Sequence, residues 1–301
     1  MTQAYWEAKI KGIISPFNLG EINRRLQQSN NCQGYLQQLD VVFSYSNIDS
    51  HIIDLASEIA NASDRTVLNS LSVSLEDNSK LNVSHLLSGE SLELSSAYSE
   101  YRSLINVAGS PQKFSESSFQ NTNNIDVEEL KELYWWLWRC LPEIICNDDR
   151  NQDNFLLPAS LILPDASIWS YASLTSAIAG ALTGYETTSK TPQTPYLATF
   201  SFSPIQEIIK ASRKMRDFWA GSWVLHYLSA KVCWKLAKKY GPDTLIYPSL
   251  FQQPLIDHWL LEENWNDFSE EWVKQPEDRA ILTAGFPNVI VILLPCDKLK
   301  A

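Results

Sequence analysis

The 301-residue sequence is poor in the side chains that hold metal ions. It has four histidines and five cysteines, and no two cysteines form a Cys-x-x-Cys pair. A structural zinc site ordinarily shows such short ligand spacing, and the closest two cysteines, Cys140 and Cys146, do not show it. An odd number of cysteines is also typical of reduced thiols. We therefore expect no metal site and no disulfide framework.

Long apolar runs are absent as well. No stretch reaches the about 18 apolar residues that a membrane-spanning helix needs, and the first residues, MTQAYWEAKIKG, contain no apolar signal core. These absences exclude a membrane span and a secretory leader from the expectations. We expect a cytoplasmic protein.

Positive charge is in deficit. The sequence has 24 Lys and Arg against 35 Asp and Glu, which gives a formal net charge of −11. Proteins that bind nucleic acid on their own are usually basic, because neutralising phosphates supplies much of the affinity. The overall charge therefore argues against a free-standing nucleic-acid binder, although it leaves room for a local basic strip.

Aromatic residues, by contrast, are abundant, with 11 Trp and 12 Tyr. Rings of this size usually fill cores or partner interfaces. The first part of the chain reads as mainly helical. We predict an amphipathic helix over residues 5–14, and a second over 51–61 with Ile52, Leu55 and Ile59 on one face. A buried aromatic helix is predicted over residues 126–140, ended by Pro142, and a further helix of small residues over 173–182.

A polar, proline-containing linker over residues 186–195 indicates a domain boundary, so we predict domains at 1–190 and 191–301. Beyond it the pattern changes. Strands are predicted at 196–203, 244–247 and 288–294, the last as a buried central strand, and a long helix at 204–240, with a bend near Gly221. Together these elements predict an α+β fold.

The stretch over residues 200–240 holds eight basic and two acidic residues. On one continuous helix Lys210, Lys214 and Asp217 would share a face with Arg213. Such a face suits phosphate or RNA backbone. A solvated face with an Arg213–Asp217 ion pair is the alternative. For Trp219, Trp223 and Trp234, on the same helix, we expect core packing, with stacking on a base as the alternative.

Four segments in order carry a family resemblance: LPDASIWSYASLTSAIAGAL, SFSPIQEIIKASRKMRDFWAGSWVLHYLSAK, YGPDTLIYPSLFQQPLIDHWL and RAILTAGFPNVIVILLP. They resemble the N-terminal part of the large subunit of type III-B CRISPR–Cas effectors, the Cmr complex. The resemblance implies a helical domain of the HD phosphohydrolase kind over residues 1–190. It implies a first palm domain, ferredoxin-like and incomplete, over residues 191–301.

An HD domain cuts single-stranded DNA with metal ions held by His and Asp. Where the family has its first His-Asp pair, this sequence reads Ile-Ile-Ser-Pro-Phe around Ser15. Where a second histidine is expected, it reads Trp-Ser-Tyr, ending at Tyr171. Neither hydroxyl replaces imidazole or carboxylate at a catalytic metal. We therefore predict a degenerate HD domain with no catalytic residues.

The family also makes cyclic oligoadenylate from ATP between two palms, using a Gly-Gly-Asp-Asp turn in the second. This sequence has no Gly-Gly dipeptide, and we expect it to end within or just after the first palm. ATP and a divalent metal are therefore expected only if a second palm is paired with it. By position in the palm, candidate nucleotide-binding residues are Ser203, Gln206, Arg213, Asp217 and Ser222. Candidate RNA or phosphate contacts are Lys210, Lys214 and Arg216.

The leading hypothesis is a non-catalytic or partial large subunit that acts as a structural or interaction component. Its expected partners are the other Cmr subunits, the crRNA and the target RNA. The alternative is half of a split nuclease and cyclic-oligoadenylate synthase, whose Gly-Gly-Asp-Asp palm is encoded separately. An independent ATP-binding module is a third hypothesis.

Overall fold

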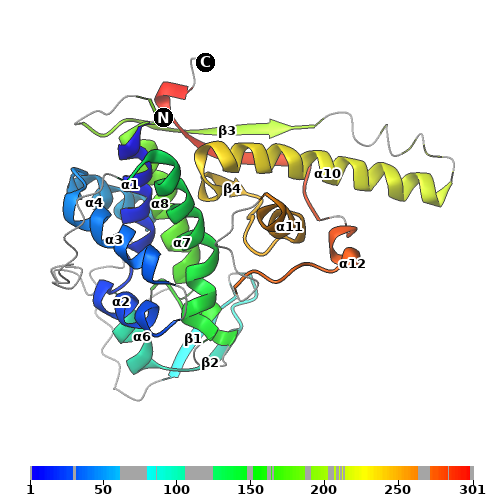
Figure 1. Ribbon diagram of the computed structural model, residues 1–301. Helices are drawn as coiled ribbons and strands as arrows, with labels where there is room; N and C mark the ends of the chain where they lie inside the picture. Colours follow the sequence, from blue (N-terminus) through cyan, green and yellow to red (C-terminus); the bar gives the residue numbers. More distant parts are fainter. Residues whose placement is uncertain are drawn as a thin grey trace. The chain divides into compact units, whose positions relative to one another are not determined.

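The structure is a computed structural model, and it describes residues 2–29, 32–61, 80–85, 87–105, 125–147, 152–160, 164, 166–186, 191–202, 207, 210, 212, 214–263, 272–283 and 285–298. The chain divides into two compact units, Met1–Thr194 and Pro195–Ala301. Both helices and small sheets are present (Figure 1), so the predicted α+β class is confirmed.

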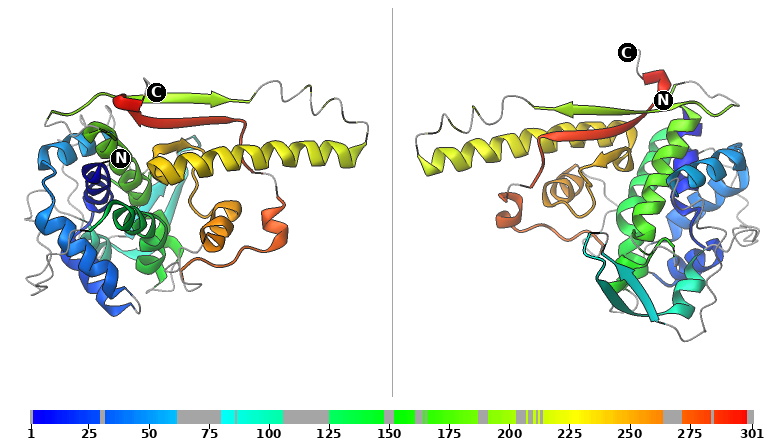
Figure 2. Two further views of the ribbon diagram at one scale, coloured as in Figure 1. Left: turned by 45° about the horizontal axis from the view of Figure 1, so that its top comes forward. Right: turned by 180° about the vertical axis from the view of Figure 1, so that it is seen from behind.

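The first unit is mainly helical. Its central helix, α1, packs against α8 and α7, while α4 covers another side of α8. A two-stranded antiparallel hairpin, β1–β2, lies at one end of this unit (Figure 2). The helices are α1 (Gln3–Ile14), α2 (Leu19–Gln28), α3 (Gln33–Tyr45), α4 (Ser50–Ala60), α6 (Tyr98–Leu104), α7 (Val127–Asn147) and α8 (Ile168–Thr183), and the strands are β1 (Lys80–Ser84) and β2 (Ser91–Ala97).

Small residues let α1 and α8 approach closely, as predicted for residues 173–182. A Cβ added at Gly12 would lie 2.8 Å from the Cα of Ser176. The Ser176 hydroxyl donates to the carbonyl of Lys9 at 3.0 Å and lies 2.9 Å from the Tyr134 hydroxyl. One serine thus links α1, α7 and α8.

The expected amphipathic character of α1 is wrong, because the helix is buried on nearly all sides. Even Lys9 is fully buried. Its ammonium lies 5.1 Å from the ring centroid of Tyr5, 5.4 Å from that of Trp6 and 4.8 Å from that of Tyr134. Cation–π attraction of this kind offsets part of the cost of removing a charge from water.

The aromatic part of α7 is buried, as predicted, but Pro142 does not end the helix. The helix continues through this proline to Asn147. A proline inside a helix removes one backbone donor, yet Leu141, Ile144 and Ile145 around Pro142 are buried in the core. Packing therefore maintains the last turn of α7, although proline usually ends a helix.

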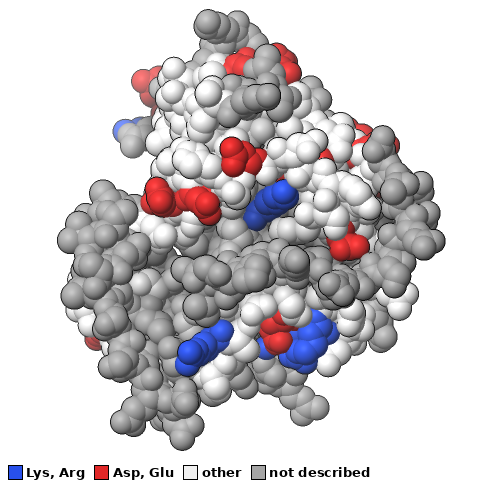
Figure 3. Space-filling view, turned by 90° about the vertical axis from the view of Figure 1, so that its left-hand side faces the viewer, with Lys and Arg blue, Asp and Glu red and all other residues white. Residues whose placement is uncertain are grey.

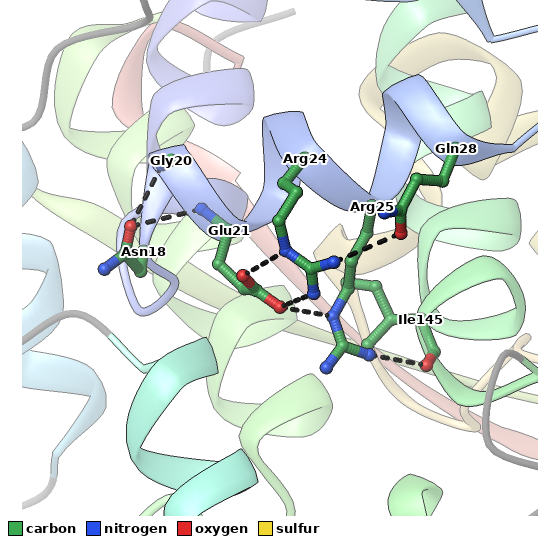
Figure 4. A network of polar contacts seen from close by, with 7 residues as sticks. All are labelled: Asn18, Gly20, Glu21, Arg24, Arg25, Gln28 and Ile145. Atoms are coloured by element: carbon green, nitrogen blue, oxygen red, sulfur yellow. Dashed lines mark hydrogen bonds and ion pairs between the residues drawn. The ribbon is translucent and has the colours of Figure 1, made fainter.

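In the helical unit, α2, α3 and α6 were not predicted. The polar stretch over residues 15–50 forms α2 and α3, and α2 is fixed by a polar network (Figure 4). Asn18 caps the helix, accepting backbone N–H bonds of 2.9 and 3.3 Å. Glu21 accepts from Arg24 and Arg25, and Arg25 donates to the carbonyl of Ile145 at 3.1 Å. The hydrogen bond from Arg24 lowers the pKa of Glu21 below its ordinary value.

The buried face of α4 also differs from the prediction. Ile52 is buried as expected, but Ile59 is exposed and Leu55 is only half-buried. Ala56 and Ala60 complete the buried side of the helix. Small residues face the core here because α4 lies close against α8. The sequence also predicts a loop at 107–125 and a short β-like run at 66–75, and both lie almost wholly outside the described residues.

The second unit contains a three-stranded antiparallel sheet with α10 along one face (Figure 2). The strand order is β3-β5-β4, so the predicted central strand is confirmed. It is not fully buried, since Val291 is half-exposed between Ile290 and Ile292. The elements are β3 (Pro195–Ser201), α10 (Met215–Tyr240), β4 (Leu245–Tyr247), α11 (Pro254–Glu262), α12 (Asp278–Ile281) and β5 (Val289–Pro295).

The core of this unit lies between the sheet and the second half of α10. Ala230, Cys233 and Ala237 are buried on the helix, opposite Ile290 and Ile292 of β5. Gly241, at φ 100°, and the following proline end the helix, as predicted. Positive φ is strained for residues with a side chain, so glycine suits this turn.

Candidate functional site

The candidate site residues concentrate at the start of α10, which begins later than predicted. Lys214 precedes the helix with extended backbone, φ −128° and ψ 153°. Its carbonyl accepts from the N–H groups of Asp217 and Phe218 at 3.0 Å each. Because the helix does not run continuously through Lys214, the predicted helical face shared by Lys210, Lys214 and Asp217 is wrong.

The candidate nucleotide residues are only partly described. Ser203, Gln206 and Arg213 lie outside the described residues. Asp217 is exposed and Ser222 is half-buried, both on α10. They are five residues apart, which on a 3.6-residue helix places them on different faces. This helix therefore does not bring the two described candidates together.

The three candidate phosphate contacts, Lys210, Lys214 and Arg216, are all exposed. Exposed large apolar residues, Met215, Phe218 and Trp219, lie near the last two in the sequence. Trp219 is 52% exposed, so the expected core packing is wrong for this residue, whereas Trp234 is 3% exposed and the same expectation is confirmed there. The exposure of Trp219 beside Arg216 is a feature that the sequence did not reveal.

A buried histidine fixes the middle of α10 to the chain before β5. The Nδ1 atom of His226 accepts hydrogen bonds of 2.8 Å from the backbone N–H groups of Gly285 and Phe286. Ser229, one turn later, donates to the carbonyl of Pro287. Burial lowers the pKa of His226, which favours the neutral ring that this pair of bonds requires.

The cations in the second half of α10 are largely engaged within the unit. Lys231 lies 3.7 Å from the ring centroid of Trp259. Lys238 forms an ion pair with Glu263, which also accepts a 3.1 Å hydrogen bond from Trp234. Although burial opposes it, the hydrogen bond from Lys238 lowers the pKa of Glu263. These lysines thus stabilise the fold, in contrast to the exposed cations at the helix start.

In the helical unit, the positions expected for HD metal ligands hold hydroxyls bonded to protein. The Ser15 hydroxyl donates to the carbonyl of Gly12 at 2.8 Å. The Tyr171 hydroxyl accepts from the Asn61 amide at 3.1 Å and is hydrogen-bonded to Ser57. This donor set does not fit a catalytic divalent ion, which binds imidazole nitrogen and carboxylate oxygen. Within the described part of the chain, no three His, Cys, Asp or Glu side chains are grouped to hold a metal.

The other described surfaces carry fewer functional groups close together. Unit 1 has a groove of about 440 Å³, lined partly by Val42, Tyr45 and Leu130, with Glu7 as its one carboxylate among the lining residues. On the face in Figure 3, the described charged side chains are scattered and form no continuous patch of one sign. Among the described helices, none is long and apolar enough to cross a membrane.

The fold thus defines an α+β protein with a helical unit followed by a small antiparallel sheet. Residues 197–301 match the family model described as "CRISPR-associated protein Cmr2, N-terminal". This match covers α10, β4, β5 and all of β3 except its first two residues.

Two curated relatives agree with the family-model match. The chain is 34% identical over 132 residues to the CRISPR system Cmr subunit Cmr2 of Pyrococcus furiosus, covering 44% of this chain and 12% of the relative. It is 24% identical over 233 residues to the Cmr2 subunit of Saccharolobus solfataricus, covering 73% of this chain and 20% of the relative. The chain therefore spans a fifth or less of these relatives.

Two solved structures share the fold. A type III-B Cmr-beta complex bound to cognate target RNA matches with a TM-score of 0.53 and 17% identity, over 83% of this chain and 26% of that one. The apo Cmr-beta complex matches with a TM-score of 0.55 and 17% identity, over 98% of this chain and 30% of that one. With the family model and the curated relatives, they confirm the predicted resemblance: this chain is similar to the N-terminal part of Cmr2, the type III-B large subunit.

Proposed function

We propose that this chain is a non-catalytic or partial large subunit of a type III-B CRISPR–Cas effector, with a structural and interaction role. The observation that carries the proposal is the family match over residues 197–301. The cytoplasm is the expected compartment. The other Cmr subunits, the crRNA and the target RNA are its proposed partners, and RNA is named for one structural neighbour.

A degenerate HD unit is part of this proposal. It is supported by the hydroxyls of Ser15 and Tyr171, which are bonded to protein groups where the resemblance places metal ligands. The purified chain with Mn²⁺ should therefore leave labelled single-stranded DNA intact. Metal-dependent cleavage that a point substitution in this unit abolishes would refute the assignment.

The second unit is proposed as a partial ferredoxin-like palm. Its support is the order strand, helix, strand, strand with β5 between β3 and β4. In such a palm ATP and metal act only with a second palm, so the isolated chain should yield no cyclic oligoadenylate. Nucleotide titration, repeated with Asp217→Ala and Arg213→Ala, tests whether the candidate residues bind ATP. Saturable binding that both substitutions abolish would favour an independent ATP-binding module.

A split enzyme is the second candidate function. Among the described strands β3 is at an edge of the sheet, and its Leu197 and Phe200 are exposed. Exposed edges of this kind pair readily with further strands. Co-expression with a separately encoded Gly-Gly-Asp-Asp palm, followed by mass spectrometry of the ATP products, tests this function. A cyclic product formed only by the pair would favour it.

A further inference from the structure

The face of α10 that packs on the sheet continues past the sheet into exposed aromatic residues. Ala230 and Cys233 are buried on this face, as is His226 one turn earlier. Ser222 lies four residues before His226, and Trp219 lies three residues before Ser222, so both are on the same face of the helix. Figure 2 shows the first turns of α10 extending beyond the ends of the strands.

The exposed end of this stripe consists of Met215, Phe218 and Trp219, which are 82%, 48% and 52% exposed. We call these three residues the aromatic stripe. Burying such side chains is ordinarily favourable, because it removes apolar surface from water. The stripe is therefore a surface on which a flat apolar partner gains stability.

Two cations flank the aromatic stripe. Lys214 is the N-cap residue directly before Met215, so it lies at the end of the helix, and Arg216 is displaced about 100° around the helix from Met215. Both are exposed. The only acid of α10, Asp217, lies on the opposite side of the helix from the stripe. A ligand on the stripe thus meets positive charge at the helix end and along one edge.

This combination matches the chemistry of a single nucleic-acid strand, in which planar bases alternate with phosphates. Bases stack on aromatic side chains while Lys and Arg follow the backbone. We propose that the first two turns of α10 bind single-stranded RNA, with a base on Trp219 and phosphates at Lys214 and Arg216. This inference rests on the proposed function, which supplies RNA as the strand. A local site of this kind is compatible with the net charge of −11, because it needs only the cations at one end of α10.

The test is binding of a fluorescein-labelled oligoribonucleotide to the full chain, measured by anisotropy. Trp219→Ala should weaken binding roughly 5- to 150-fold, the loss of one stacked base. Trp219→Phe keeps a ring and should retain most of the affinity. The matched control is Leu228→Ala, because Leu228 is 46% exposed on another face of the same helix, and it should leave binding unchanged.

The cations are tested by the salt dependence of the same binding. Arg216→Ala should reduce the slope of log affinity against log salt by about one. Lys235→Ala, which removes an exposed cation at the far end of α10, is the matched control and should leave the slope nearly unchanged. Equal effects of the two substitutions would contradict phosphate contact at Arg216.

Three results would overturn the inference. They are absence of saturable RNA binding, equal affinities for Trp219→Ala and Leu228→Ala, and tighter binding of DNA of the same sequence than of RNA. Loss of a protein partner from Trp219→Ala with RNA affinity intact would assign the stripe to a protein instead.

Association with Cmr subunits is measured separately by co-purification, so failure of the proposed function is distinguished from failure at Trp219. If Trp219→Ala does not fold, Trp219→Phe and Arg216→Ala carry the test.

Discussion

At the scale of single residues, His226 holds two backbone groups with one ring nitrogen. Only a neutral ring can accept from Gly285 and Phe286, because a protonated imidazole has donors alone. Burial lowers the pKa of His226 below the ordinary 6.5. The unfolded chain therefore takes up this proton at a higher pH than the folded chain does.

It follows that folding stability should fall as the pH drops below 6.5 toward the lowered folded pKa, and should be fully present above 6.5. Urea unfolding on both sides of that pH measures the effect. His226→Asn keeps an acceptor without a titrating ring, so it should remove this part of the pH dependence. His51→Asn, at an exposed histidine, is the control. An unchanged pH profile in His226→Asn would contradict the assigned role.

Cysteine reactivity gives a second residue-scale prediction. Burial raises the pKa of the Cys233 thiol to about 12, and only the thiolate is nucleophilic. Under native conditions Cys233 should resist alkylation while the half-exposed Cys296 reacts. Mass spectrometry of timed alkylation checks the order. Cys233 modified as fast as Cys296 in the folded protein would show that the core of unit 2 opens readily.

The exposure of single side chains was the property least predictable from the sequence. Trp219 and Trp234 lie on one helix, and both fit a core interpretation equally well in the sequence. Their tertiary surroundings separate them, since Trp234 is buried with its ring centroid 6.0 Å from that of Trp259 in α11, whereas Trp219 is 52% exposed. Such surroundings are a tertiary property, so a single helical pattern does not reveal them.

At the scale of elements, the pair α1–α8 depends on glycine at the crossing. Gly12→Ala would place a Cβ 2.8 Å from backbone of Ser176, so one helix must shift. We expect a loss of about 1–3 kcal/mol in the free energy of unfolding, typical of overpacked cores. Chemical denaturation measures it.

The control is Gly34→Ala in α3, where an added Cβ has no neighbour within 4 Å. It should be neutral or stabilising by up to about 1 kcal/mol, because alanine favours helix. A Gly12→Ala variant as stable as Gly34→Ala would contradict the close approach of α1 and α8.

Several elements could be predicted from their own patterns, and others could not. The strands β3, β4 and β5 carry β-branched and aromatic runs, which sequence reasoning detects. The helix α2 carries a local signal that the prediction missed, since Leu19, Ile22 and Leu26 are buried at helical spacing behind the Asn18 cap. Pro142 led to the opposite error, because the buried residues Leu141, Ile144 and Ile145 keep the helix going past a residue that usually ends one. Only the second case depends on tertiary packing.

At the scale of the whole molecule, the candidate site was only partly predictable. Arg216 and Lys214 were found from local charge, and both are exposed. The predicted helical face of Lys210, Lys214 and Asp217 is wrong, since the backbone at Lys214 is extended rather than helical. The family resemblance was recognised from ordered segments such as residues 279–295, which fall within the matched region.

The central claim is that this chain takes part in a type III-B effector assembly. The most direct measurement is co-expression of the affinity-tagged chain with the remaining Cmr subunits and a crRNA, followed by purification through the tag. The account predicts that Cmr subunits and crRNA elute with the full-length chain in fixed stoichiometry. Elution of the folded chain alone, with neither subunit nor crRNA bound, would contradict it.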